Sequence, residues 1–96
     1  MAQETARVYF ASVKMKRMRK EDSYPIKMLK ALDCAGLADV VAGKRVAVKV
    51  HLGQDTNFST IHPALVRMVI NKIKAAGGRP YVVHSWGALN GYERGY

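Results

Sequence analysis

Short segments typical of β-strands alternate with longer helical patterns along this chain of 96 residues. Three segments rich in β-branched and aromatic residues predict strands: Arg7–Val13, Val46–Leu52 and Pro80–Val83. Between them, apolar residues recur at steps of three and four, which predicts amphipathic helices. The order β-α-β-α-β implies right-handed crossovers and a small parallel sheet flanked by helices. The sequence therefore predicts an α/β fold.

The two predicted helices have recognisable ends. Ser23 and Pro25 suit a helix start, as a capping hydroxyl and a first-turn proline, and Gly36 suits its end. The second helix has its apolar face between residues 65 and 73 and stops at Gly77 and Gly78. The apolar run of residues 46–48 favours a strand that is buried on both faces.

The length allows one small domain, residues 1–96. A three-stranded sheet leaves two edges to be covered, and Trp86, Tyr92 and Tyr96 call for burial or a partner. We therefore expect the chain to be either a single α/β domain or the N-terminal fragment of a larger α/β domain. A C-terminal part, a partner chain or another copy in an oligomer would then cover the sheet edges and these aromatic side chains.

The net charge of +9 permits nucleic acid, an anionic membrane face or an acidic protein as a partner. Much of this charge lies in the run Lys14–Lys20, for which a solvated loop or an intersubunit contact is an alternative interpretation. No nucleic-acid-binding motif accompanies the run. No apolar stretch is long enough to cross a membrane, and residues 1–7 do not form a secretory signal, so we expect a cytoplasmic protein without a membrane partner.

A polar loop joins the second predicted strand to the second predicted helix. In an open parallel sheet, ligands bind beyond the carboxyl ends of the strands. A glycine allows close backbone approach there, and the start of the following helix favours an anion. We therefore predict an anionic substrate or cofactor site at this rim, formed by His51, Gly53, Thr60, His62 and Lys14.

Structural roles remain open for the same residues. His62 precedes Pro63 and could be the helix N-cap, Thr60 or Ser59 could cap the helix, and His51 could be a histidine at the edge of the core. His84 ends the third strand at the same rim.

Metal binding and catalysis have little support in the sequence. The three histidines match no standard zinc spacing, so we predict no metal site, and the sequence leaves the catalytic residues unassigned. Cys34 is the single cysteine, and we expect it to be a small buried hydrophobic residue.

The segments "VYFASVKMKRM", "KVHLG", "TIHPALVRMVINKIKAAGGRPYVV" and "NGYERGY" resemble the N-terminal part of the domain of unknown function 362 family. These are uncharacterised iron–sulfur-centre proteins, and the resemblance extends from Arg7 to Tyr96. It implies the ligand-binding portion of a redox protein with an iron–sulfur cluster. The ferredoxin-like cysteine motifs of that family have no counterpart among these residues, so no cluster ligand is assigned here.

Three hypotheses follow. The first is the N-terminal ligand-binding portion of an iron–sulfur-type redox protein, whose reaction is not specified. The second is a small basic nucleic-acid-binding protein that uses the Lys14–Lys20 run with Arg7, Lys44 and Arg45. The third is a structural subunit of an oligomer.

Overall fold

The computed structural model describes residues 4–52 and 60–84. The chain divides into two compact units, residues 1–37 and 38–96. Gly53, Ser59 and the aromatic residues of the C-terminal segment lie outside the described residues, and so do the predictions made for them.

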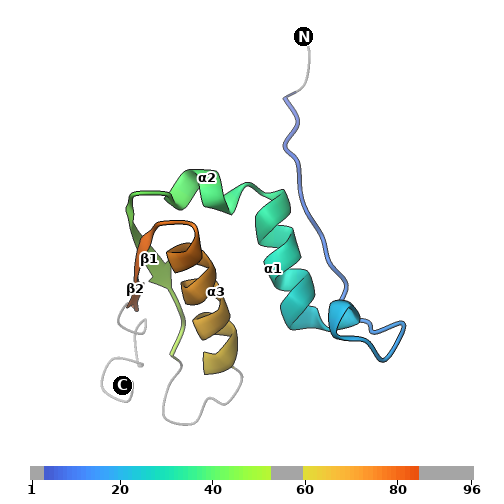
Figure 1. The fold of residues 1–96 in the computed structure, drawn as a ribbon. Helices are drawn as coiled ribbons and strands as arrows, with labels where there is room; N and C mark the ends of the chain where they lie inside the picture. The colour runs from blue at the N-terminus through green and yellow to red at the C-terminus, as the bar shows by residue number, and fades with distance from the viewer. Residues whose placement is uncertain (1–3, 53–59, 85–96) are drawn as a thin grey trace, which may run out of the picture. The chain divides into compact units, whose positions relative to one another are not determined.

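The first unit contains a 3-10 helix, η1 (Lys20–Asp22), and the helix α1 (Tyr24–Cys34) (Figure 1). Ser23 occupies the N-cap position of α1 and a proline follows in the first turn, as predicted. Its hydroxyl, however, donates to the carbonyl oxygen of Lys20 at 2.6 Å and does not cap α1. Gly36 follows the helix with φ of 78°, a conformation that favours glycine.

The predicted first strand, Arg7–Val13, is not a strand in the structure. Its backbone joins no sheet in the described residues, and Val8 and Phe10 are 85% and 87% exposed. The composition of this segment is typical of a strand, but that preference has an energetic effect only where a neighbouring strand supplies pairing and side-chain packing. The segment is tied instead to α1, because Lys27 Nζ donates to the carbonyl oxygens of Ser12 and Lys14 at 2.9 and 2.7 Å.

Cys34 is exposed, which corrects the prediction that it is buried. None of the side chains of α1 is buried, so the apolar face of this helix provides no interior for a thiol. Cys34 lies on the wall of a groove of about 310 Å³ between α1 and residues 8–11.

The second unit contains β1 (Arg45–Lys49), α3 (Pro63–Ala75) and β2 (Arg79–Val83), and the short helix α2 (Leu37–Val41) spans the boundary between the units. The two strands are parallel, with Arg45 opposite Arg79 and Lys49 opposite Val83. Figure 1 shows α3 alongside the two strands, running in the opposite direction. The α/β class and the parallel sheet are therefore confirmed, with two strands in the described residues.

The core of this unit is small and apolar. Ile73 of α3 is 2% exposed, and Val41 and Val50 are the other buried hydrophobic residues among those described. Gly77 ends α3 with φ of 87°, as the sequence predicted. Gly78 then passes so close to α3 that a Cβ atom there would lie 2.7 Å from Ile73 Cγ2.

The sheet is not buried on both faces by the described elements. In β1, Val46 and Val48 are half-buried, whereas Arg45, Ala47 and Lys49 are exposed. Successive side chains of a strand point to opposite faces, so this alternation is that of a strand with one solvated face. The prediction failed because Ala47, a small apolar residue, extended the apolar run without being part of the core.

None of the helices in residues 4–52 and 60–84 is both long and apolar enough to span a bilayer.

Candidate functional site

His51 and His84 stack on each other at the carboxyl end of the sheet. Their ring centroids are 5.5 Å apart and the ring planes differ by 12°. The ladder extends one residue beyond β1, because the N–H of Val50 donates to the carbonyl oxygen of Val83 at 3.0 Å. The register pairs Lys49 with Val83, so His84 lies beside Val50 and the ring of His51, one residue further along, stacks on it.

The hydrogen bond of His84 defines which ring nitrogen carries its proton. Nδ1 of His84 lies 2.7 Å from the carbonyl oxygen of Val50. A carbonyl oxygen only accepts, so Nδ1 must donate, and the neutral ring therefore has its lone pair on Nε2. Nε2 is buried, whereas the ring of His51 is exposed. The pair thus combines an oriented inner ring with an outer ring that solvent or a ligand can reach.

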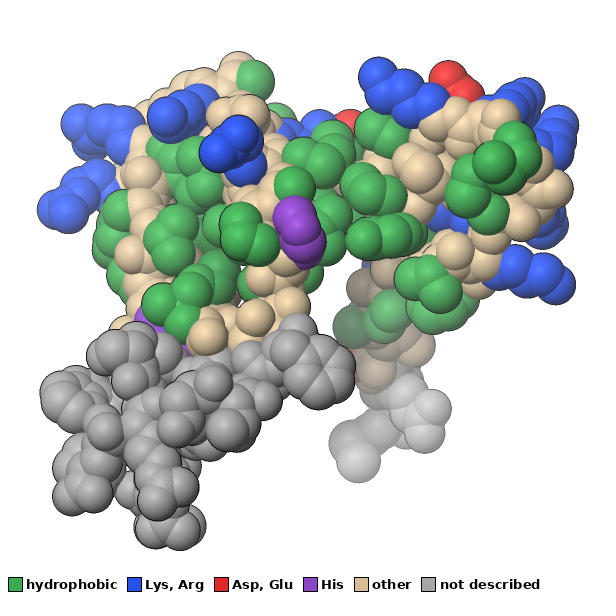
Figure 2. Space-filling model, turned by 90° about the horizontal axis from the view of Figure 1, so that it is seen from below, with side chains coloured by type: hydrophobic (Ala, Val, Ile, Leu, Met, Phe, Trp, Pro, Cys, Tyr) green, Lys and Arg blue, Asp and Glu red, His purple; other side chains and the backbone are tan. Residues whose placement is uncertain are grey.

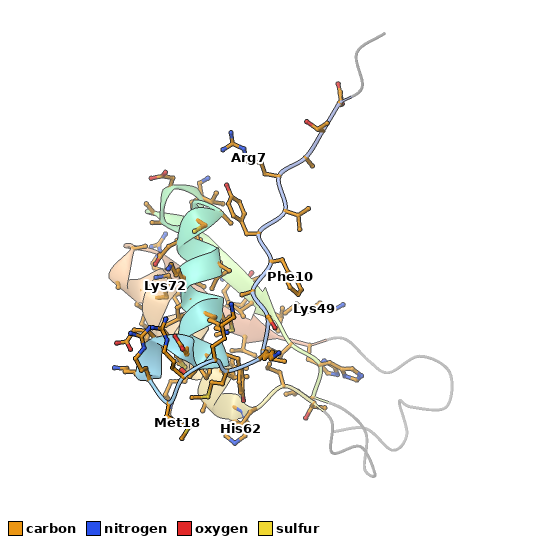
Figure 3. All side chains as sticks on the ribbon, turned by 90° about the vertical axis from the view of Figure 1, so that its right-hand side faces the viewer. Arg7, Phe10, Met18, Lys49, His62 and Lys72 are labelled. Atoms are coloured by element: carbon orange, nitrogen blue, oxygen red, sulfur yellow. The ribbon has the colours of Figure 1, made fainter. Side chains whose placement is uncertain are left out.

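His62 is the N-cap of α3, the structural role that the sequence left open. Its Nδ1 accepts a hydrogen bond from the N–H of Ala64 at 3.0 Å, and Figure 3 shows its place at the start of the helix. Leu65 N–H donates to the carbonyl oxygen of His62 at 2.9 Å, and Pro63 has no N–H. The first donors of α3 are therefore occupied within the chain. An anion near this helix would gain from the helix dipole and not from those N–H groups.

The structure does not bring all the predicted site residues together. Thr60 is half-buried and lies just before α3, but His62 and not Thr60 caps the helix. Lys14 belongs to the other unit, where its N–H donates to Ser12 Oγ at 3.1 Å. Gly53 is outside the described residues. Of the predicted ligand-binding residues, His51 has the clearest partner, and that partner is His84.

The sequence predicted His84 at this rim but not its contact with His51. The useful signal is the position of each histidine relative to its strand: each lies at the end of a β-branched segment. These positions bring the two rings into contact only because the strands are neighbours in the observed register.

The residues described do not fit an iron–sulfur cluster. Such clusters are held mainly by cysteine thiolates, and the chain has only Cys34. No group of three or more His, Cys, Asp or Glu side chains in the described ranges could hold a metal ion.

A separate ionic cluster lies in the first unit. Asp22 Oδ2 is 3.6 Å from Arg17 Nε, and Asp22 Oδ1 is 3.5 Å from Arg19 Nη2. Desolvation alone would raise the pKa of Asp22, but the charges of Arg19 and Arg17 and their hydrogen bonds together lower that pKa below its ordinary value. Part of the positive charge of the 14–20 run is therefore neutralised within the chain.

No family model, curated protein or solved structure matches this chain.

Proposed function

We propose that residues 38–84 are the ligand-binding part of an α/β protein, with an anionic ligand bound at the His51–His84 pair. The observation that supports this best is the stacking of two imidazoles beyond the carboxyl ends of adjacent parallel strands. This is the edge at which open α/β sheets bind ligands. The exposed ring of His51 would donate to an oxygen of the ligand, while the hydrogen bond to Val50 keeps the ring of His84 in place.

The charge of the unit supports an anionic ligand. Its described residues include one acidic side chain, Asp39, and a larger set of basic ones: Lys44, Arg45, Lys49, Arg67, Lys72, Lys74 and Arg79. Such an excess attracts anions over a range of about 10 Å at 0.1 M ionic strength. A phosphate or a carboxylate group suits this field and an imidazole donor.

The wider role we propose comes from the resemblance to the domain of unknown function 362 family. This chain would be the ligand-binding portion of a redox protein, and cysteines supplied from outside these residues would hold the iron–sulfur cluster. Native mass spectrometry of anaerobically purified protein tests this role. A heavier assembly containing iron and sulfide is expected. An assembly that lacks either one would contradict the proposed role in an iron–sulfur redox protein.

The ligand site itself is tested with inorganic phosphate and pyrophosphate as probes. Nitrogen-detected NMR of the histidine rings should show saturable shifts for His51. Removing one hydrogen bond to a charged group costs about 1.5–3 kcal/mol, so His51→Ala should weaken binding roughly ten- to hundredfold.

Two further variants distinguish a ligand-binding role of the histidines from a purely structural role. His84→Asn keeps a donor within reach of Val50 but removes the stacked ring, and it should weaken binding without unfolding the unit. His62→Asn keeps an N-cap on α3 and should leave binding unchanged. Equal binding by all three variants would contradict the proposed site.

A further inference from the structure

The face of the sheet turned away from the apolar layer carries an organised set of cations around one aromatic ring. Arg45, Ala47 and Lys49 point to this face from β1, and Arg79, Tyr81 and the half-buried Val83 point to it from β2. The opposite face carries Val46, Val48, Pro80 and Val82 in the same register. All the cations of the two strands therefore share one face with Tyr81, and the opposite face carries only apolar side chains.

Tyr81 and Arg45 form a contact on the open face. The guanidinium carbon of Arg45 lies 5.4 Å from the centroid of the Tyr81 ring, a cation–π distance. Tyr81 is 44% exposed, so this residue remains partly accessible beside the charge. Arg79 is directly opposite Arg45 in the register, and Lys49 is at the other end of β1 (Figure 3).

The charges on this face indicate which kind of partner can bind to it. A second apolar layer would have to desolvate Arg45, Lys49 and Arg79, which is costly unless each charge is paired. No acidic side chain alternates with them in β1 or β2. Figure 2 shows several Lys and Arg side chains at the left of the view, the side on which Figure 1 draws α3 and the two strands, and others at the right. The face is therefore complementary to a polyanion.

A polyanion that also carries planar groups can contact both the cations and the aromatic ring of this face. Proteins bind single-stranded nucleic acids by combining cations that contact the backbone with aromatic rings on which bases stack. Such stacking tolerates different bases because every base has a π-face. A double helix keeps its bases stacked within the duplex and would leave the ring of Tyr81 unused.

We propose that this open face, defined by Arg45, Lys49, Arg79 and Tyr81, binds single-stranded nucleic acid. One base stacks on Tyr81 beside the guanidinium of Arg45, and the cations neutralise adjacent phosphates. This inference does not depend on the proposed function, because the His51–His84 pair lies beyond the strand ends and none of the four residues belongs to it.

The experiment is fluorescence anisotropy of the full chain with a labelled twelve-nucleotide oligouridylate, at several salt concentrations. Tyr81→Ile retains β-propensity and removes the ring, and it should weaken binding about tenfold, as expected for the loss of one base–aromatic stack. Tyr81→Phe keeps the ring and should bind like the native chain. Arg45→Ala should reduce the slope of log K against log salt by about 0.7.

Lys74→Ala is the matched control, because it removes an exposed cation from α3 and not from the open face. It should leave both the affinity and the salt slope unchanged. Equal losses for Arg45→Ala and Lys74→Ala, with no loss for Tyr81→Ile, would mean general charge attraction and would overturn the proposal. Absence of binding would overturn it too.

A competition experiment tests whether the partner of this face is a nucleic acid or a protein. An acidic amphipathic helical peptide is tested in competition with the oligouridylate. Tighter, Arg45-dependent binding of the peptide, with no measurable dependence of either ligand on Tyr81, would assign the face to a protein partner and refute the proposal.

Discussion

Gly78 lies directly against Ile73: a Cβ atom at Gly78 would be 2.7 Å from Ile73 Cγ2 and 3.0 Å from the carbonyl oxygen of Val41. The absence of a side chain at Gly78 thus lets β2 begin beside the C-terminal end of α3. This close approach and the burial of Ile73 together define the small core of the second unit.

Gly78→Ala should destabilise the second unit by about 1–3 kcal/mol, the usual cost of inserting a methyl group into a packed site. Urea unfolding followed by circular dichroism measures this change. In the double variant with Ile73→Leu, which moves the branch away from Cβ, part of the loss should be recovered. Recovery should remain partial, because the contacts with two backbone oxygens persist. A neutral Gly78→Ala substitution would show that the chain relaxes at this point.

Ile73→Ala should cost about 2–5 kcal/mol, and Ile73→Val about 0.5–1.5 kcal/mol. Ile73 is 2% exposed, so nearly every removed atom leaves a cavity or exposes apolar surface. Thermal unfolding of the two variants checks the order of the effects. Similar values for both would mean that the site collapses around the shorter side chain.

His62→Ala should destabilise α3 by about 0.5–2 kcal/mol, because the N–H of Ala64 loses its acceptor. His62→Asn and His62→Asp should restore most of the loss, since both are good N-cap residues. Amide hydrogen exchange in the first turn of α3 measures the effect directly. Unchanged protection in His62→Ala would assign the cap to another group.

The ion pairs of Asp22 should make the first unit sensitive to acid. Because the pKa of Asp22 is lower in the folded chain than in the unfolded chain, its contribution is fully present above the ordinary pKa of an aspartate. The contribution is lost as the pH falls through the lower, folded-state pKa. Hydrogen exchange at Ser23, whose N–H donates to Lys20 at the end of η1, should therefore increase in this acidic range.

Asp22→Asn is the control for that titration. It removes the charge at every pH, so the exchange at Ser23 should no longer change across the acidic range. Persistence of the transition in Asp22→Asn would mean that another acidic group is responsible.

The second unit was the more predictable part of the molecule. The spacing of apolar residues predicted α3, and Gly77 marked its end, because both signals are local and act on the same few residues. The segment of residues 7–13 shows the limit of this reasoning. Its strand character was evident, but strand formation requires a neighbour, which the local sequence does not specify.

The location of the two histidines could be predicted from the sequence, but their contacts could not. The strand ends correctly located His51 and His84 at one edge of the sheet. Their stacking depends on the register between strands, and the use of His62 as a cap depends on which ring atom faces Ala64. Neither property is encoded by the spacing of residues alone.

The parallel pairing of β1 with β2 has a consequence for how the second unit folds. Opposite residues such as 45 and 79 are far apart in sequence, so closing the chain between them costs entropy before any ladder bond forms. Formation of α3 shortens that distance, and we expect it to precede the ladder. Helix-weakening changes at exposed α3 positions, such as Lys74→Gly, should then slow folding, whereas Val82→Ala in β2 should mainly speed unfolding. Stopped-flow kinetics with both variants would reveal the sequence of these events.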